Sequence, residues 1–323
     1  MDIVQAAAAA QSIKENINRV IIGKSEVIDL VLTSLLAGGH ILLEDVPGTG
    51  KTKLAKSLAR SLDLPFSRIQ FTPDLLPSDI TGINYYNQKQ GEFVYREGPV
   101  FANIVLADEI NRATPRTQSS LLECMEEKQV TVDGVTMHLE EPFLVIATQN
   151  PIETAGTYPL PEAQLDRFLM QLSMGVPQES EELQMMERFI KGDPLDEIEP
   201  VCSKETLLLM SQVHRDVFVH AGIREYILAL ITKTRKHEKI KLGVSPRGTL
   251  AFVKAVQAYA VIEGRDYVIP EDVKTLAVPV MAHRLVMYGG MNRSRNTVNT
   301  IKEILDQVPV PTENWEKIGR AHV

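Results

Sequence analysis

The sequence predicts an α/β protein in which a parallel sheet is sandwiched between helices and is followed by a smaller all-helical region. Two features lead to this fold class. In the first half, short apolar runs such as 40–44 and 143–147 alternate with stretches whose apolar residues recur at helical spacing. In the second half the strand-like runs stop, and helical spacing takes over. We therefore expect two domains, residues 1–178 and residues 179–317.

Composition places the chain among soluble globular proteins. Its 323 residues are 44% hydrophobic and 24% charged, enough for a large core. No apolar run approaches the ~18 residues that a membrane span needs. The first residues lack the basic segment of a signal or transit peptide, and the alanine run at 6–10 indicates a helix. We expect a cytoplasmic protein that does not insert into membranes, and the net charge of −8 disfavours binding of nucleic acid by its surface as a whole.

Cysteines and histidines give no metal or redox signal. Cys124 and Cys202 are far apart and form no C-x-x-C pair, so we interpret them as small buried hydrophobic residues. The spacing of His214 and His220 does not place both rings on one helical face, which favours structural roles over metal ligation.

The segment 45–52 (DVPGTGKT) departs from the phosphate-binding pattern G-x-x-x-x-G-K-[ST] only at its first position, Asp45. It lies between a predicted strand and a predicted helix, as that pattern requires. Backbone N–H groups would then point at phosphates, Lys51 would reach the β and γ oxygens, and Thr52 would offer its hydroxyl to magnesium. We expect Asp45 to be tolerated, because the glycines by which the backbone approaches phosphate are present. The expected loop residues of the site are Pro47, Gly48, Thr49, Gly50, Lys51 and Thr52.

A second pattern bears on the alternative for this loop, which is an ordinary strand-to-helix turn with a surface lysine. Residues 104–107 are apolar and are followed by Asp108 and Glu109, at the strand end where open α/β sheets bind ligands. There Asp108 would bind the nucleotide's magnesium, and Glu109 would orient and polarise an attacking water. The competing interpretation is a pair of acids that cap the next helix.

A third apolar run, 143–147, ends in the polar residues Thr148, Gln149 and Asn150. An amide would emerge there at the same edge of the sheet, and Asn150 is positioned to hold the water or the γ-phosphate. The alternative is a turn-forming asparagine before Pro151.

With these motifs in this order, the sequence resembles the MoxR family of AAA+ ATPases from about Ile21 to Pro311. The stretches GPVFANIVLADEINRATPRTQSSLLECMEEKQVTVDG and ATQNPIETAGTYPLPEAQLDRFL carry the resemblance. It implies a P-loop NTPase αβα sandwich with a small helical lid, and ATP and Mg²⁺ as cofactors. The family's Walker A loop matches residues 48–52, Walker B matches Asp108 and Glu109, and sensor 1 matches Asn150.

The resemblance also assigns roles to arginines. Arg167 in LDRF falls where the family carries an arginine finger, which would reach the nucleotide of a neighbouring subunit and implies a homo-oligomeric ring, expected to be a hexamer. Arg247 in GVSPRGTLAF falls at the lid's sensor 2, in the first turn of a helix, where we expect it to face nucleotide bound between lid and core. Arg112 either bridges subunits or pairs with an acid such as Glu109. The expected catalytic residues are Lys51, Glu109, Asn150, Arg167 and Arg247.

Two segments resemble the insertions of the helix-2-insert group, to which this family belongs. Residues 79–101 alternate aromatic and polar residues around Gln90-Gly91, and residues 128–143 carry Asp133-Gly134 between β-branched residues, so we predict two hairpins. In the resembling ATPases such hairpins face the pore or the partner. The alternative is surface structure without a role.

The second half begins with an amphipathic helix after Pro177. Four further helices are predicted at 204–218, 224–237, 246–262 and 270–284, which together form the lid. The last six residues, 318–323 (IGRAHV), have no counterpart in the family pattern, and we expect them to be an artefactual, disordered tail.

These features predict a magnesium-dependent ATPase that remodels or matures partner protein complexes. The resemblance suggests clients with a von Willebrand factor A domain or a metal cofactor. Three alternatives stay open: a nucleic-acid motor of the helicase or branch-migration type, a metal-chelatase ATPase subunit, and a scaffold that binds ATP without useful turnover. The acidic balance speaks against the motor, and intact Glu109, Asn150 and Arg167 speak against the scaffold.

Overall fold

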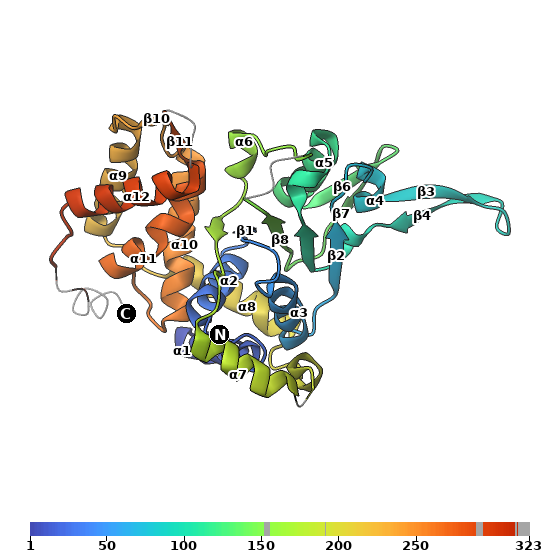
Figure 1. Cartoon of the computed structure of the whole chain (residues 1–323), viewed down its shortest axis with the longest axis horizontal. Helices are drawn as coiled ribbons and strands as arrows, with labels where there is room; N and C mark the ends of the chain where they lie inside the picture. The colour runs from blue at the N-terminus through green and yellow to red at the C-terminus, as the bar shows by residue number, and fades with distance from the viewer. Residues whose placement is uncertain (152–155, 191, 289–292, 314, 316–323) are drawn as a thin grey trace.

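The computed structural model describes residues 1–151, 156–190, 192–288, 293–313 and 315. Its centre is a five-stranded parallel sheet with the order β2-β5-β8-β1-β9, which confirms the predicted fold class (Figure 1). The strands of this sheet are β1 (Ile41–Glu44), β2 (Phe66–Gln70), β5 (Ile104–Asp108), β8 (Leu144–Gln149) and β9 (Met170–Leu172).

The sheet is buried on both faces. Ile104 and Leu106 of β5 enter one apolar core, whereas Val105 and Ala107 enter another, as the period of two in a strand requires. β1 and β8 alternate in the same way, which explains why these strands are continuous apolar runs. The first core includes α3 (Lys51–Ser61), and the second includes α5 (Pro115–Glu127).

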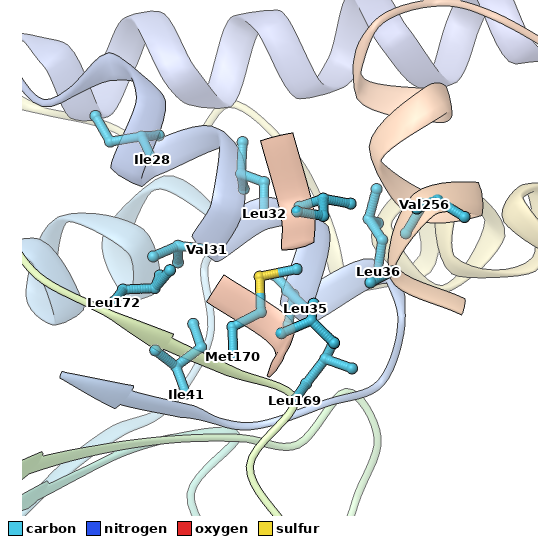
Figure 2. Close-up of a cluster of buried hydrophobic side chains, with 14 of the residues drawn as sticks. Ile28, Val31, Leu32, Leu35, Leu36, Ile41, Leu169, Met170, Leu172 and Val256 are labelled. Carbon is cyan, nitrogen blue, oxygen red and sulfur yellow. The ribbon is translucent and has the colours of Figure 1, made fainter. Parts of the chain in front are cut away.

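The first of these cores continues without a break into the second half of the chain. α1 (Ile3–Asn18) and α2 (Ser25–Leu36) both pack against α10 (Pro246–Ile262). Figure 2 shows Leu36 of α2, Ile41 of β1, Met170 of β9 and Val256 of α10 in one cluster. The predicted boundary at residue 178 falls in the connector between β9 and α7, and the apolar core extends across both sides of it.

The second half contains helices in all four predicted stretches. They are α8 (Lys204–Val213) with η4 (His214–Asp216), α9 (Ala221–Lys236), α10, and α11 (Pro270–Met281) with η5 (Ala282–Arg284). The amphipathic helix after Pro177 is α7 (Glu179–Ile190), and it is followed by η3 (Pro194–Glu197). None of the described helices is both long and apolar enough to cross a membrane.

Two parts of the second half were not predicted. α12 (Arg293–Gln307) follows α11, and a two-stranded antiparallel ribbon pairs β10 (Ile240–Leu242) with β11 (Val286–Met287). Strands this short show no alternation that a sequence pattern can reveal. The expected tail at 318–323 lies outside the described residues.

Both predicted hairpins are present. β3 (Gly82–Asn87) pairs with β4 (Glu92–Glu97), and β6 (Gln129–Val132) pairs with β7 (Val135–His138). Asp133 and Gly134 both have positive φ, at 50° and 81°, as a tight hairpin turn requires. Figure 1 shows the β3–β4 hairpin projecting from the rest of the molecule. The remaining short elements are α4 (Pro77–Thr81), η1 (Pro99–Phe101), η2 (Ile110–Arg112) and α6 (Glu162–Leu165).

Candidate active site

A cavity of about 530 Å³ lies at the carboxyl ends of β1, β5 and β8. Its wall includes the glycine-rich loop after β1, the two acids at the end of β5 and the polar residues at the end of β8. The sequence-predicted members of this wall are Pro47, Gly48, Thr49, Gly50, Lys51, Thr52, Asp108, Glu109 and Asn150. Parallel strands bring their carboxyl ends to one edge, so three motifs distant in sequence meet there.

The glycine-rich loop has the backbone conformation that its sequence predicts. Gly48 and Gly50 have φ of +87° and +91°, a region that side-chain-bearing residues rarely adopt. Gly50 directly precedes α3, whose first N–H groups have no partner within the helix. Lys51 Nζ donates hydrogen bonds to the carbonyl oxygens of Asp45 and Val46, at 3.0 and 3.2 Å, across the mouth of the loop. The loop therefore offers N–H groups and an ammonium group to an anion.

Asp45 has a definite structural role in this loop. Its side chain is buried, and its carboxylate accepts hydrogen bonds from Ser173 Oγ at 2.7 Å and from the backbone N–H groups of Met174 and Gly175 at 2.7 and 3.1 Å. A glycine would leave these donors without a partner. Sequence reasoning found the departure tolerable but missed that Asp45 fastens the loop to the segment after β9.

Asp108 and Glu109 are held by a shared threonine. Thr148 Oγ1 donates to Asp108 Oδ1 at 2.7 Å and accepts from the Glu109 N–H at 2.8 Å. The other oxygen of Asp108 accepts from Arg68 Nη2 at 2.6 Å. Glu109 has a φ of +57°, which turns its carboxylate out of the line of β5 and into the cavity.

The Glu109 carboxylate has two neighbours of its own. Its Oε2 accepts from Gln70 Nε2 at 2.8 Å and lies 3.1 Å from Arg112 Nε. Of the two roles considered for Arg112, this structure shows the pairing with Glu109. Arg68 and Gln70 were missed, although their alternation with buried Ile69 on β2 was a readable signal.

The described residues fit magnesium better than a metal held by protein ligands alone. No group of three or more His, Cys, Asp or Glu side chains able to hold a metal ion occurs among them. Mg²⁺ is usually bound by one or two protein oxygens together with substrate phosphates. The Thr52 hydroxyl and the Asp108 carboxylate, both in the cavity wall, form such an incomplete donor set.

One side of the cavity is apolar, and sequence reasoning did not identify it. Its residues come from the turn after α1, from the segment after β9, and from α7. They are Val20, Ile21, Ile22, Met174, Pro177, Met185 and Phe189. Lys53 Nζ lies over the Phe189 ring, 4.6 Å from its centre. A wall of this kind suits the flat face of a nucleotide base.

Arg167 and Arg247 lie elsewhere. Neither is among the described residues that line the cavity, and both pair with Glu126 of α5, with Arg167 Nε at 3.1 Å and Arg247 Nη2 at 2.7 Å. The structure does not show the expected position of Arg247, facing the cavity between its own lid and core, because the start of α10 lies beside the end of α5. Arg167, expected to serve a neighbouring subunit, lies away from its own cavity.

A buried ion pair holds the two arginines' segments together. Arg284 Nε donates to Asp166 Oδ1 at 2.7 Å, and Ser245 Oγ donates to Asp166 Oδ2 at 2.9 Å while capping α10. Burial lowers the pKa of Arg284, whereas Asp166 raises it. Asp166, the residue directly before Arg167, is therefore hydrogen-bonded to the start of the helix that carries Arg247.

The cysteines behave as predicted. Cys124 and Cys202 are both buried. Burial raises the pKa of the Cys124 thiol to about 12 and that of Cys202 to about 11. Neither thiol forms a reactive thiolate near neutral pH.

Comparison with known proteins places this site in a family. Residues 40–170 match the model described as "ATPase family associated with various cellular activities (AAA)", and residues 232–307 match an AAA lid domain. Over 300 residues the chain is 52% identical to the uncharacterized protein YeaC of Bacillus subtilis, which covers 93% of this chain and 94% of YeaC. It is 41% identical to Chaperone MoxR1 of Mycobacterium tuberculosis over 92% of this chain and 81% of that protein. The chain belongs to the MoxR family of AAA+ ATPases.

A solved structure supports the same conclusion. A Cytophaga hutchinsonii protein, described as a candidate ATPase, superposes with a TM-score of 0.87 and 38% identity over 95% of this MoxR-family chain and 96% of that protein. The architecture is thus the P-loop αβα fold followed by the AAA lid.

Proposed function

We propose that this MoxR-family protein binds ATP with magnesium in the cavity and hydrolyses it. The observation that carries the proposal is the meeting of the glycine-rich loop, Asp108 with Glu109, and Asn150 around one cavity. The loop N–H groups and the start of α3 would hold the phosphates, and the apolar wall would receive the base.

The groups that bind phosphate and magnesium follow from their contacts. Thr52 and Asp108 would hold magnesium, which neutralises charge on the β and γ oxygens when it is bound. Lys51 Nζ donates hydrogen bonds to two carbonyl oxygens of the loop. When nucleotide binds, it would donate instead to phosphate oxygens, which are stronger acceptors for an ammonium group.

Hydrolysis needs a base beside the γ-phosphate. The Glu109 carboxylate would accept a proton from the attacking water, and Asn150 would orient that water or the γ-phosphate. Gln70 and Arg112 contact the Glu109 carboxylate and would hold it until nucleotide arrives.

We further propose that the chain works as a homo-oligomeric ring of six subunits. Arg167 and Arg247 both lie on Glu126, outside the cavity of their own chain, so each would serve the cavity of a neighbour. An arginine against the developing γ-phosphate charge raises the rate about 10³- to 10⁵-fold. Hydrolysis would then depend on assembly.

The work performed is proposed to be remodelling of partner proteins in the cytoplasm. One relative is named a chaperone. The projecting β3–β4 hairpin exposes large apolar side chains, a feature of surfaces that bind other proteins: Ile83, Tyr85, Tyr86 and Phe93. We propose clients that contain a von Willebrand factor A domain or a metal cofactor.

The test is a substrate trap. Glu109→Gln should bind ATP, lose hydrolysis about 10²- to 10⁴-fold and retain its client. The assembled variant is captured from cell extract with and without ATP, beside Glu123→Gln, an exposed glutamate of α5, as the matched control. A protein that co-purifies only with ATP supports the proposal. Recovery of nucleic acid, or of nothing that depends on ATP, would refute the remodelling role and leave only the ATPase.

A further inference from the structure

α7 has an apolar face that none of the described residues of its own chain covers. All 12 residues of this helix are described, and none is buried. Leu183, Met186 and Ile190 are 57%, 58% and 83% exposed, and their spacing of three and four residues places them on one face. A helix of this length is marginal in water and depends on packing of its apolar face.

The rest of α7 is anchored, so this face has a fixed direction. Arg188 Nη1 donates to the carbonyl oxygens of Asn18 and Arg19, at 2.8 and 2.6 Å. Met185 and Phe189 line the nucleotide cavity. Met186 and Ile190 directly follow these two lining residues in the sequence. The exposed face therefore lies beside the cavity.

A matching stripe occurs on α10. Arg247, Leu250 and Lys254 are all exposed and share one helical face, with Leu250 at 67%. The opposite face of α10 carries the fully buried Phe252 and Val256, which fixes the stripe outward. A large apolar side chain between two cations is thus presented beside the end of α5.

The two faces are complementary in charge as well as in apolarity. α7 carries four glutamates and one arginine, at positions 179, 181, 182, 187 and 188. Residues 246–254 contain Arg247 and Lys254 and no acid. Opposite charges around an apolar contact favour one partner and disfavour the pairing of like faces.

The two faces also lie at separated places on the molecule. Arg247, the first residue of the stripe, pairs with Glu126 near the end of α5, and Figure 1 shows α5 on the upper side of the molecule and α7 on the lower side. Two different patches on opposite sides of one molecule can join copies head to tail, which closes a ring when the rotation permits.

We propose that the exposed face of α7 (Leu183, Met186 and Ile190) is the docking surface for the α10 stripe (Arg247, Leu250 and Lys254) of a second copy of this chain. The proposal rests on the proposed function in one respect: the arriving α10 brings Arg247 to a cavity that its own chain leaves without it. α7 thereby becomes the element that senses both the bound nucleotide and the neighbour.

Cross-linking tests the contact directly. Met186→Cys and Leu250→Cys are prepared separately, mixed with ATP in the Glu109→Gln background and oxidised mildly. Cys124 and Cys202 are buried and stay silent. We expect a covalent dimer only in the mixture, and a ladder of oligomers from the chain that carries both cysteines. Met186→Cys mixed with Leu228→Cys of α9, which is 53% exposed, is the control and should stay monomeric.

Assembly gives a second measurement. Met186→Asp should raise the concentration for half-assembly at least tenfold in sedimentation, whereas Leu209→Asp on α8, 47% exposed, should change it less than twofold. A dimer from Met186→Cys alone would show that α7 pairs with itself and would overturn the proposal. A cross-link within a single monomer of the double variant would overturn it equally.

Binding of fluorescent ATP to the same samples distinguishes a failure of the docking surface from a failure of the proposed ATPase function. If ATP binds and a ring forms without the Met186–Leu250 cross-link, the docking surface is wrong and the ATPase proposal stands. If the cross-link forms but ATP does not bind, the proposed function is wrong and the docking surface stands.

Discussion

The cavity wall and the arginine-bearing surface are built in opposite ways. At the cavity, buried groups with several partners hold the glycine-rich loop and the two acids, as Asp45 and Thr148 show. At the surface, Arg167 and Arg247 share the single carboxylate of Glu126, and all three side chains are 29–47% exposed. Exposed pairs contribute about 0–1 kcal/mol, so these arginines can leave Glu126 at little cost. The difference indicates that the fold completes the cavity wall within one chain and leaves the arginines available to another.

The most direct test of this comparison removes the arginine from one chain and the lysine of the glycine-rich loop from another. Arg167→Ala should lower kcat about 10³- to 10⁵-fold with little change in ATP affinity, because its charge acts on the developing γ-phosphate. Mixing it with Lys51→Ala should restore part of the activity, since each variant supplies what the other lacks. Steady-state ATPase assays measure both effects.

Arg224→Ala, an exposed arginine on α9, is the matched control and should keep full activity. If the mixture of Arg167→Ala and Lys51→Ala stays as inactive as its components, the arginine serves its own chain and the comparison fails.

The cavity side of the comparison predicts a cost in stability. Asp45→Ala should lower the free energy of unfolding by on the order of 3 kcal/mol, because it leaves the buried N–H group of Met174 and the partly buried N–H group of Gly175 without an acceptor. ATP affinity should fall with it, since the loop loses its attachment after β9. Urea unfolding and nucleotide titration measure the two effects.

Ser173→Ala removes one of the three hydrogen bonds to Asp45 and should cost about 1 kcal/mol. Equal effects of the two variants would show that the backbone hydrogen bonds to Asp45 contribute nothing.

His40 connects the two regions and predicts a pH dependence. It lies at the start of β1, accepts from the Val145 N–H at Nδ1, and so donates from Nε2 to the Met125 carbonyl, next to Glu126. Burial lowers its pKa to about 4, well below the usual 6.5. A depressed histidine pKa means that the folded state favours the neutral ring. The contribution of His40 to the free energy of unfolding is therefore fully present above pH 6.5 and is lost as pH falls from 6.5 towards 4.

Between pH 7.5 and pH 5 the loss from His40 should be on the order of 2 kcal/mol in unfolding free energy. His40→Gln removes the titration and should flatten this part of the profile, even if the variant is less stable at pH 7.5. An unchanged slope between pH 7.5 and pH 5 in chemical denaturation would show that another group is responsible.

The smallest expected effect concerns Arg68, whose guanidinium forms a hydrogen-bonded ion pair with one carboxylate oxygen of Asp108. Arg68→Gln removes a cation that would compete with magnesium, so the magnesium concentration for half-maximal ATPase should fall up to about five-fold. A magnesium titration of wild type and variant measures it. A rise instead of a fall would mean that Arg68 helps to position Asp108.

Much of the cavity could be read from the sequence because its parts are local. Gly48, Gly50, Lys51 and Thr52 are fixed by one turn between a strand and a helix, and such a turn has a recognisable spacing. Asp108 and Asn150 follow because parallel strands end at one edge of the sheet. The bounds of α10 could be predicted for the same reason, from Ser245-Pro246 and a helical period.

What the sequence by itself determined, then, is the fold class, the phosphate loop and the acids beside it. Only the tertiary structure decided the rest, because the contacts join residues without a fixed separation along the chain: Asp45 with 173–175, Arg68 with Asp108, and Arg247 with Glu126. Packing of α10 against α1 and α2 placed Arg247 away from its own cavity. A pattern gives the chemistry of a side chain, but its partner depends on how whole helices pack.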